Sequence, residues 1–292
     1  MKLNITVLLI MLFFSGACRS SPVQAALIPG TETLSPVPLT LTPTFTATAL
    51  PTATLAPTGT PILGATPEPI RKTPPTLMLH RPNLQFDSLA FLKDFINILK
   101  QNNMKVVTYR DIYEHPEITA TEQGKLFIIT IDDISLAYPM DRHVIEMIGL
   151  LREAGYPAVL GVVTATDYPD RGNVARLREL SDLGWEIASH TDTHANLGKL
   201  EKASSKLVYN EVYPSLDKIE KTIGIRPITL VLPEGQMVND INILCEMKLF
   251  WVVGINGGVT YDSRNKVIYV GREGPDKNAE YTYKIMKMRF GF

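Results

Sequence analysis

From Thr76 onward, short apolar runs alternate with longer segments in which apolar residues recur at helical spacing. Short apolar runs bounded by turn residues are typical of strands, and regular alternation of strands with helices favours a parallel sheet. Seven such units in roughly 200 residues fit a barrel at least as well as an open sheet. The strands are predicted at residues 76–79, 105–109, 126–131, 158–163, 185–189, 228–232 and 250–254.

The segments between these strands carry recognisable helix signals. One apolar stripe follows a possible N-cap at Asp87 or Ser88, and a second stripe begins at Val144. Residues 207–223 form a third long helical pattern, which we expect to bend near Pro214 because proline lacks the backbone N–H that the helix needs.

The residues before Thr76 do not have the composition of a folded domain. A positive start and the apolar run 3–14 predict a signal peptide within residues 1–25, too short to span a bilayer comfortably. Residues 26–75, rich in threonine and proline, predict a disordered, extended linker. The folded domain is therefore expected at residues 76–292.

Two processing routes are open at the signal. Ser15-Gly16-Ala17-Cys18 resembles a bacterial lipobox, although Ser15 stands where that motif usually has a branched apolar residue. A lipid on Cys18 would tether the protein to a membrane; the alternative is ordinary cleavage after Ala25. The other cysteine, Cys245, lies in an apolar run and is expected to be buried rather than nucleophilic.

The charge and the aromatic residues exclude some functions. The formal net charge is -1 and the basic residues are spread along the chain, so no nucleic-acid partner is predicted, and no protein partner is evident. Trp185 and Trp251 could stack on sugars, but each lies within or beside a predicted strand, so core packing is expected for both.

Polar side chains follow two of the predicted strands directly. Asp132 and Asp133 end one apolar strand, and His190 and His194 lie just beyond another. Taken alone, each pair has a plain explanation, a helix cap for the aspartates and a solvated face for the histidines. Because the carboxyl ends of parallel strands meet on one rim, the two pairs together predict ligands of a single metal.

These residues resemble the motifs of the polysaccharide deacetylases of carbohydrate esterase family 4. Residues 130–133 (Thr-Ile-Asp-Asp) are similar to the family's Thr-Phe-Asp-Asp-Gly, and residues 190–194 match its His-Ser/Thr-x-x-His. The order and spacing agree, and flanking segments at 77–80, 154–158 and 183–188 extend the resemblance.

The resemblance implies a distorted (β/α)7 barrel that hydrolyses N- or O-acetyl groups of a glycan. It implies that Asp133, His190 and His194 hold a divalent metal, usually Zn2+, and that Asp132 is the general base. Such a ligand set leaves zinc an open position, but it also accepts Co2+, Ni2+ or Fe2+. Asp192, inside the histidine motif, is expected to face solvent.

Three departures from the family pattern affect the mechanism. Ile134 replaces a glycine and is expected to reshape the pocket, and Glu234 replaces an aromatic residue in the segment 232–235. The backbone N–H of Glu234 is a candidate oxyanion donor, the alternative being a simple turn. No histidine follows His194, so His80, at the end of the first strand, is a candidate proton donor, the alternative being a structural rim residue.

The expected protein is an exported metal-dependent deacetylase acting on an acetylated extracellular or cell-wall polysaccharide, located at the cell surface or outside the cell. A catalytically degenerate module of the same fold that only binds glycan is the alternative, and another metal hydrolase on the same barrel is a third.

Overall fold

The computed structural model describes residues 73–81, 86–240, 242–255, 258–262 and 267–292. Contacts divide the chain into Met1–Pro61 and Ile62–Phe292, and every described residue lies in the second unit. The predicted signal peptide and lipid site, and nearly all of the predicted linker, therefore lie outside the described residues. Within the described ranges, no helix combines the length and the apolar character needed to cross a membrane.

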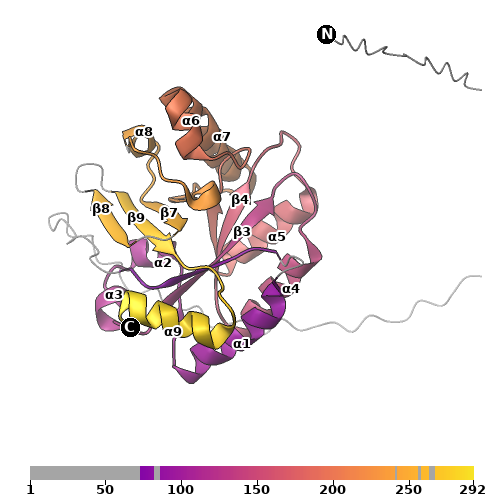
Figure 1. The fold of residues 1–292 in the computed structure, drawn as a ribbon. Coiled ribbons are helices and arrows are strands. Elements are labelled where there is room, and N and C mark those ends of the chain that lie inside the picture. Colours follow the sequence, from indigo (N-terminus) through magenta and orange to yellow (C-terminus); the bar gives the residue numbers. More distant parts are fainter. Residues whose placement is uncertain (1–72, 82–85, 241, 256–257, 263–266) are drawn as a thin grey trace, which may run out of the picture. The chain divides into compact units, whose positions relative to one another are not determined.

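Seven parallel strands form a barrel with helices on its outer side (Figure 1), which is the predicted distorted (β/α)7 architecture. A bridge between Leu77 and Glu273 joins the first strand to the end of the last. The Met78 N–H donates to the Glu273 carbonyl at 2.8 Å, and the Glu273 N–H donates to the Thr76 carbonyl at 3.0 Å. In sheet order the strands are β1 (Thr76–Leu79), β3 (Leu126–Ser135), β4 (Val159–Val163), β5 (Glu186–Ser189), β6 (Thr229–Val231), β7 (Trp251–Ile255) and β9 (Val267–Arg272).

One predicted barrel strand was wrong. In the 105–109 segment only β2 (Lys105–Val106) is a strand, pairing with the start of β3, and Tyr109 already begins a helix. The seventh barrel strand is instead β9, which pairs with β7 in parallel and with the outer strand β8 (Val259–Asp262) in antiparallel fashion. Thr108 caps the helix at Tyr109 through a reciprocal side-chain bond with Asp111, which ends the extended segment early.

The predicted helices form where their caps and apolar stripes place them. The Asp87 carboxylate accepts from the N–H groups of Leu89 and Ala90, so α1 begins at Ser88. The third predicted helix begins two residues earlier than expected, at Ser205, and contains Pro214. The helices of the described chain are α1 (Ser88–Gln101), α2 (Tyr109–Glu114), α3 (Ile118–Thr121), α4 (Arg142–Ala154), α5 (Arg171–Asp182), α6 (Leu197–Ala203), α7 (Ser205–Ile223), the 3-10 turn η1 (Pro233–Gly235), α8 (Asn242–Cys245) and α9 (Ala279–Phe290).

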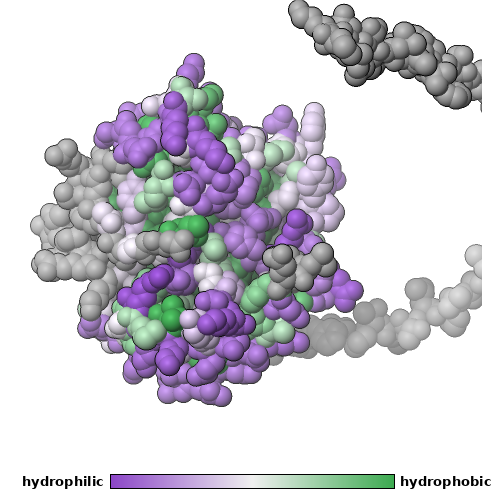
Figure 2. Space-filling view, in the orientation of Figure 1, coloured by the Kyte–Doolittle hydropathy of each residue, from purple (hydrophilic) through white to green (hydrophobic). Residues whose placement is uncertain are grey.

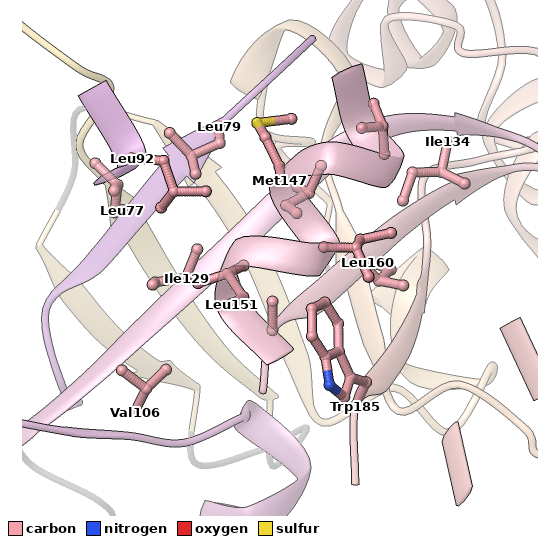
Figure 3. Packing of buried hydrophobic residues seen from close by; sticks show 14 of the residues in the cluster. Leu77, Leu79, Leu92, Val106, Ile129, Ile134, Met147, Leu151, Leu160 and Trp185 are labelled. Carbon is pink, nitrogen blue, oxygen red and sulfur yellow. The ribbon is translucent and has the colours of Figure 1, made fainter. Parts of the chain in front are cut away.

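Alternate residues of the strands face two separate cores. Leu79, Ile129 and Leu160 pack outward against α1 and α4 (Figure 3), with Trp185 in the same cluster. Residues of the other parity, including Ile128, fill the barrel interior together with the fully buried Trp251. Both tryptophans are therefore core residues, as expected. Hydrophilic residues predominate on much of the outer surface, with hydrophobic residues showing in small patches (Figure 2).

Candidate metal centre and acid-base site

A β-bulge at the end of β3 separates the two aspartates. Up to Thr130 the even-numbered residues of this strand face the barrel interior, and the register against β4 shifts between Ile131 and Ile134. Asp132 consequently remains inside the barrel, whereas Asp133, with a left-handed φ of 62°, turns towards the rim. Two adjacent carboxylates thus meet different surroundings.

The same bulge determines where Ile134 lies. This side chain is buried in the outer core beside the helices, where Figure 3 shows it. It has no left-handed backbone conformation, so a glycine is not required at this position. Isoleucine in place of glycine therefore adds to the hydrophobic core, and it also lines the cavity beside Asp132 and Asp133, so its expected effect on the pocket stays a prediction.

Asp132 is buried and paired with a cation that the motif search missed. The Arg272 guanidinium, on β9, donates to Asp132 Oδ1 at 2.8 Å, to the Thr130 hydroxyl at 2.7 Å and to the Gly254 carbonyl at 3.1 Å. Burial alone would raise the pKa of Asp132, but the adjacent Arg272, with help from His190 and His80, lowers it below the usual aspartate range. Asp132 is therefore a carboxylate at neutral pH.

The two histidines extend from the end of β5 towards Asp133. His190 Nε2 lies 3.3 Å and His194 Nε2 lies 3.0 Å from the same oxygen of Asp133. His190 is 2% exposed, whereas Asp133 and His194 are 38% and 40% exposed, so the cluster opens to solvent on one side. Burial opposes the charge on Asp133, but the hydrogen bond and charge of His190 and the charges of His80 and His194 bring its pKa to about 2.

This donor set fits a divalent metal. One ligand atom from each of Asp133, His190 and His194 lies within 4.8 Å of the others. Around a four-coordinate ion with bonds of about 2.0–2.1 Å, neighbouring donor atoms lie roughly 3.3 Å apart, close to the oxygen–nitrogen separations seen here. The His190 Nδ1–H donates to the Val231 carbonyl at 2.9 Å, so Nε2 faces the cluster and would offer its lone pair to a metal once it gives up the proton that it shares with Asp133.

The loop that carries the histidines is held by the side chains of α7. The Glu211 carboxylate accepts from the Thr193 N–H at 2.5 Å and from its hydroxyl at 3.0 Å, and from the Ala195 N–H at 3.4 Å. Thr191 and His194 have left-handed φ values of 65° and 61°, a conformation that costs of the order of 1 kcal/mol or more per residue. Glu211 offsets part of this cost by accepting hydrogen bonds from the backbone of the same loop, at Thr193 and Ala195. No sequence motif had indicated this role of Glu211.

Asp192 does not face solvent as expected. Its side chain is 18% exposed and receives the Lys218 ammonium at 2.8 Å and the Thr164 hydroxyl at 2.7 Å. Lys218 comes from α7 and Thr164 follows β4, so Asp192 ties the histidine loop to two neighbouring elements. The residue has a structural explanation within this loop, separate from the metal ligands.

The remaining candidates, His80 and Glu234, both lie at the site. His80 Nε2 is 3.8 Å from Asp132 Oδ2, the oxygen that Arg272 does not hold. Glu234 has a left-handed φ of 55°, and its exposed carboxylate accepts from the Asn196 amide at 2.6 Å, which together with Lys199 lowers its pKa. Its side chain is thus turned to the N-terminus of α6. Within the described chain its backbone N–H has no hydrogen-bond acceptor.

Several solved structures share this fold, and two of the three described here are named as deacetylases. Solved structures that resemble the chain include the deacetylase PplD of Streptococcus pyogenes in complex with acetate, with 16% identity, coverage of 73% of this chain and 97% of that one, and a TM-score of 0.57. IcaB of Ammonifex degensii has 16% identity, coverage of 73% and 94%, and a TM-score of 0.58. A de-N-acetylase of Aggregatibacter actinomycetemcomitans has 20% identity, coverage of 73% and 98%, and a TM-score of 0.53.

These likenesses show the fold, and a comparison of the sequence with family models adds a match over part of the chain. No curated protein matches the chain. The family model described as polysaccharide deacetylase matches residues 119–249, a range that contains both aspartates, both histidines and Glu234. The barrel and the motif residues agree with this match, so residues 119–249 are similar to the polysaccharide deacetylase family.

Proposed function

We propose that the protein is an active, metal-dependent deacetylase that hydrolyses N- or O-acetyl groups of an extracellular or cell-wall glycan. The family acts on acetylated polysaccharides by hydrolysing amide bonds. The observation that carries the proposal is the pairing of a three-donor cluster with a separate, buried and ionised carboxylate, Asp132. A module that only binds glycan has no need to keep an unligated carboxylate charged beside the cluster.

Asp133, His190 and His194 would hold the metal, most often zinc in sites of this kind. When bound, the metal would polarise the acetyl carbonyl and make water a better nucleophile at neutral pH. Asp132 Oδ2 is the base that takes the proton of the attacking water, because Oδ1 is occupied by Arg272. Arg272 keeps this carboxylate ionised and fixes its orientation.

Two groups serve the later part of the reaction. The Glu234 backbone N–H, left without a partner in the described chain, donates to the oxygen on which negative charge develops. His80 Nε2 lies 3.8 Å from Asp132 Oδ2, so a bridging water or a small movement of the imidazole would let it receive the proton and pass it to the leaving nitrogen or oxygen, the role of the histidine missing after His194.

The cellular location is also part of the proposal. The positive start, the apolar run 3–14 and the threonine- and proline-rich residues 26–75 support export, with the domain held on an extended linker. A lipid on Cys18 would keep the protein at the cell surface. Mass spectrometry of the mature N-terminus distinguishes lipidated Cys18 from cleavage after Ala25.

The decisive experiment measures metal content and acetate release together. Wild type should bind one zinc and release acetate from oligomers of N-acetylglucosamine. Asp132→Asn should keep its zinc and lose about 10³-fold in kcat, because general-base catalysis contributes roughly 10²–10⁴-fold.

The controls separate the alternatives. His80→Ala should lose at least tenfold in kcat, and near-normal activity would remove His80 from the mechanism. Tight zinc without acetate release from several acetylated glycans would favour the degenerate glycan-binding module, which Ile134, Glu234 and the missing late histidine support. Absence of bound metal in the wild type would refute the proposal itself.

A further inference from the structure

A cavity of about 330 Å3 adjoins the metal-ligand cluster. It shares Asp132 and Asp133 with the site, and its other walls include Arg81, Tyr138 and Asp141. Pockets that bind small ligands begin at roughly 300 Å3, so this one is large enough for a single sugar ring.

Asn173 fixes the segment that carries Tyr138. This buried side chain, on α5, donates from its amide nitrogen to the carbonyls of Ser135 and Tyr138 at 2.8 Å and 2.5 Å. Its amide oxygen accepts from the Met140 N–H at 2.8 Å, and the Ser135 hydroxyl accepts from the Tyr138 N–H at 3.3 Å. The backbone of Tyr138 is therefore held at both its N–H and its carbonyl.

The ring of Tyr138 contrasts with this firm backbone, because Tyr138 is 72% exposed. A tyrosine with so much of its side chain exposed contributes little to the core. Its backbone is nevertheless held in place where the residue lines the cavity. Rigid aromatic side chains bind at a low cost in conformational entropy, and their faces suit apolar C–H surfaces.

Arg81 adds hydrogen-bond donors to the same cavity. It is exposed, and, after the hydrogen bond from the His143 N–H, its charge helps to lower the pKa of Asp141, a carboxylate that lines the same cavity. Asp141 itself caps α4 by accepting from the His143 N–H at 2.8 Å. A pyranose offers an apolar C–H face on one side and hydroxyl groups on its edge, which matches an aromatic ring together with the several N–H donors of an exposed guanidinium.

We propose that this cavity binds the sugar next to the one whose acetyl group is hydrolysed, with Tyr138 stacking on the ring and Arg81 donating to its hydroxyls. The proposal rests on the proposed function, because it extends the deacetylase site by one unit of a glycan chain. It makes Tyr138 a residue that selects polymers over short acetylated compounds.

The test uses a pentamer of N-acetylglucosamine and zinc-loaded protein. Tyr138→Ala should raise the KM for the pentamer about tenfold while kcat stays within a factor of about two, since tenfold corresponds to about 1.4 kcal/mol, near the upper end for an aromatic contact. Tyr138→Phe should retain the wild-type KM, because stacking does not use the hydroxyl. Tyr168→Ala is the matched control, since Tyr168 is 90% exposed on the next rim loop and does not line the cavity.

Binding measurements keep this inference separate from the proposed function. In an Asp132→Asn background, calorimetry should show that Tyr138→Ala weakens pentamer binding about tenfold even if no glycan is hydrolysed by the wild type. An unchanged pentamer affinity, no pentamer binding at all, or an equal loss in Tyr168→Ala would overturn the assignment. If the wild type releases no acetate but Tyr138→Ala still binds the pentamer more weakly than the protein with Tyr138, the proposed function is refuted. The assignment of the cavity as a sugar-binding site then still stands.

Discussion

Asp132 and Asp133 are positioned by the strand that carries them, whereas His190 and His194 lie in a loop that is positioned by side chains of α7. The aspartates come from a bulge inside the sheet, where backbone pairing with β4 fixes their direction. The histidine loop lies beyond the end of β5 and depends on Glu211 to satisfy its left-handed backbone.

This difference in positioning implies that different contacts control the ionisation of the base and the binding of the metal. Around the base, one buried cation from β9 is the main partner, so charge balance decides whether Asp132 ionises. Around the metal ligands, several hydrogen bonds of ordinary strength together position the histidine loop. The loss of any one of them should therefore weaken metal binding without abolishing it.

The largest effect is expected from removing the cation. Arg272→Met leaves a buried carboxylate without its partner, which should lower the free energy of unfolding by about 3 kcal/mol. Because Arg272 lowers the pKa of Asp132, its loss raises that pKa. The base is active only when ionised, so the acid limb of the kcat/KM profile should move to higher pH.

Chemical denaturation and a pH-rate profile measure these effects. The double variant Arg272→Met with Asp132→Asn should regain part of the lost stability, since it no longer buries an unpaired charge. If the double variant is as unstable as Arg272→Met alone, packing rather than charge balance explains the loss. Zinc affinity should change little in Arg272→Met if the two segments are held independently.

A smaller effect is expected in the loop. Glu211→Gln keeps the shape of the side chain but leaves only one acceptor for several donors, so zinc affinity should fall by about tenfold, within the range known for groups that orient metal ligands. Competition with a chelator measures this.

Glu201→Gln is the matched control for that change. Glu201 also accepts backbone N–H groups, but those of Asn239 and Asp240, outside the histidine loop. An equal loss of zinc affinity in both variants would show that the carboxylate on α7 has no special part in positioning the ligands.

The smallest effect is expected at Asp192. Asp192→Asn weakens the bonds with Lys218 and Thr164 in a partly exposed setting, so it should reduce the free energy of unfolding by about 1 kcal/mol and leave zinc affinity within a factor of about three. Asp167→Asn serves for comparison, because Asp167 lies 4.0 Å from the same lysine and is largely exposed. A thermal melt in which both variants lose equally would contradict a special contribution of Asp192.

Local patterns predicted most of the barrel and the residues at its rim. Strand-like runs and the Asp87 cap depend on neighbours in sequence, as does the rule that polar residues follow buried strands. The same local reading explains the misplaced strand at 105–109, since a capping box ends an extended run without changing its composition.

The contacts that complete the site are not local. Arg272 and Asp132 are 140 residues apart, and nothing in either motif specifies the partner. Likewise the bulge at Asp132 and Asp133 comes from pairing with β4, so the inward position of one aspartate and the outward position of Ile134 could not be read from the residues alone.

Arg272 also lies close to the point where the first and last parallel strands of the barrel meet. Two backbone hydrogen bonds join β1 to the residue after β9, whereas Arg272 reaches across the interior to Thr130 and Asp132 on β3, the next strand along. The ion pair therefore spans the junction between the first and last parallel strands of the described barrel. The same guanidinium links strands on both sides of this junction and favours the ionised form of the base.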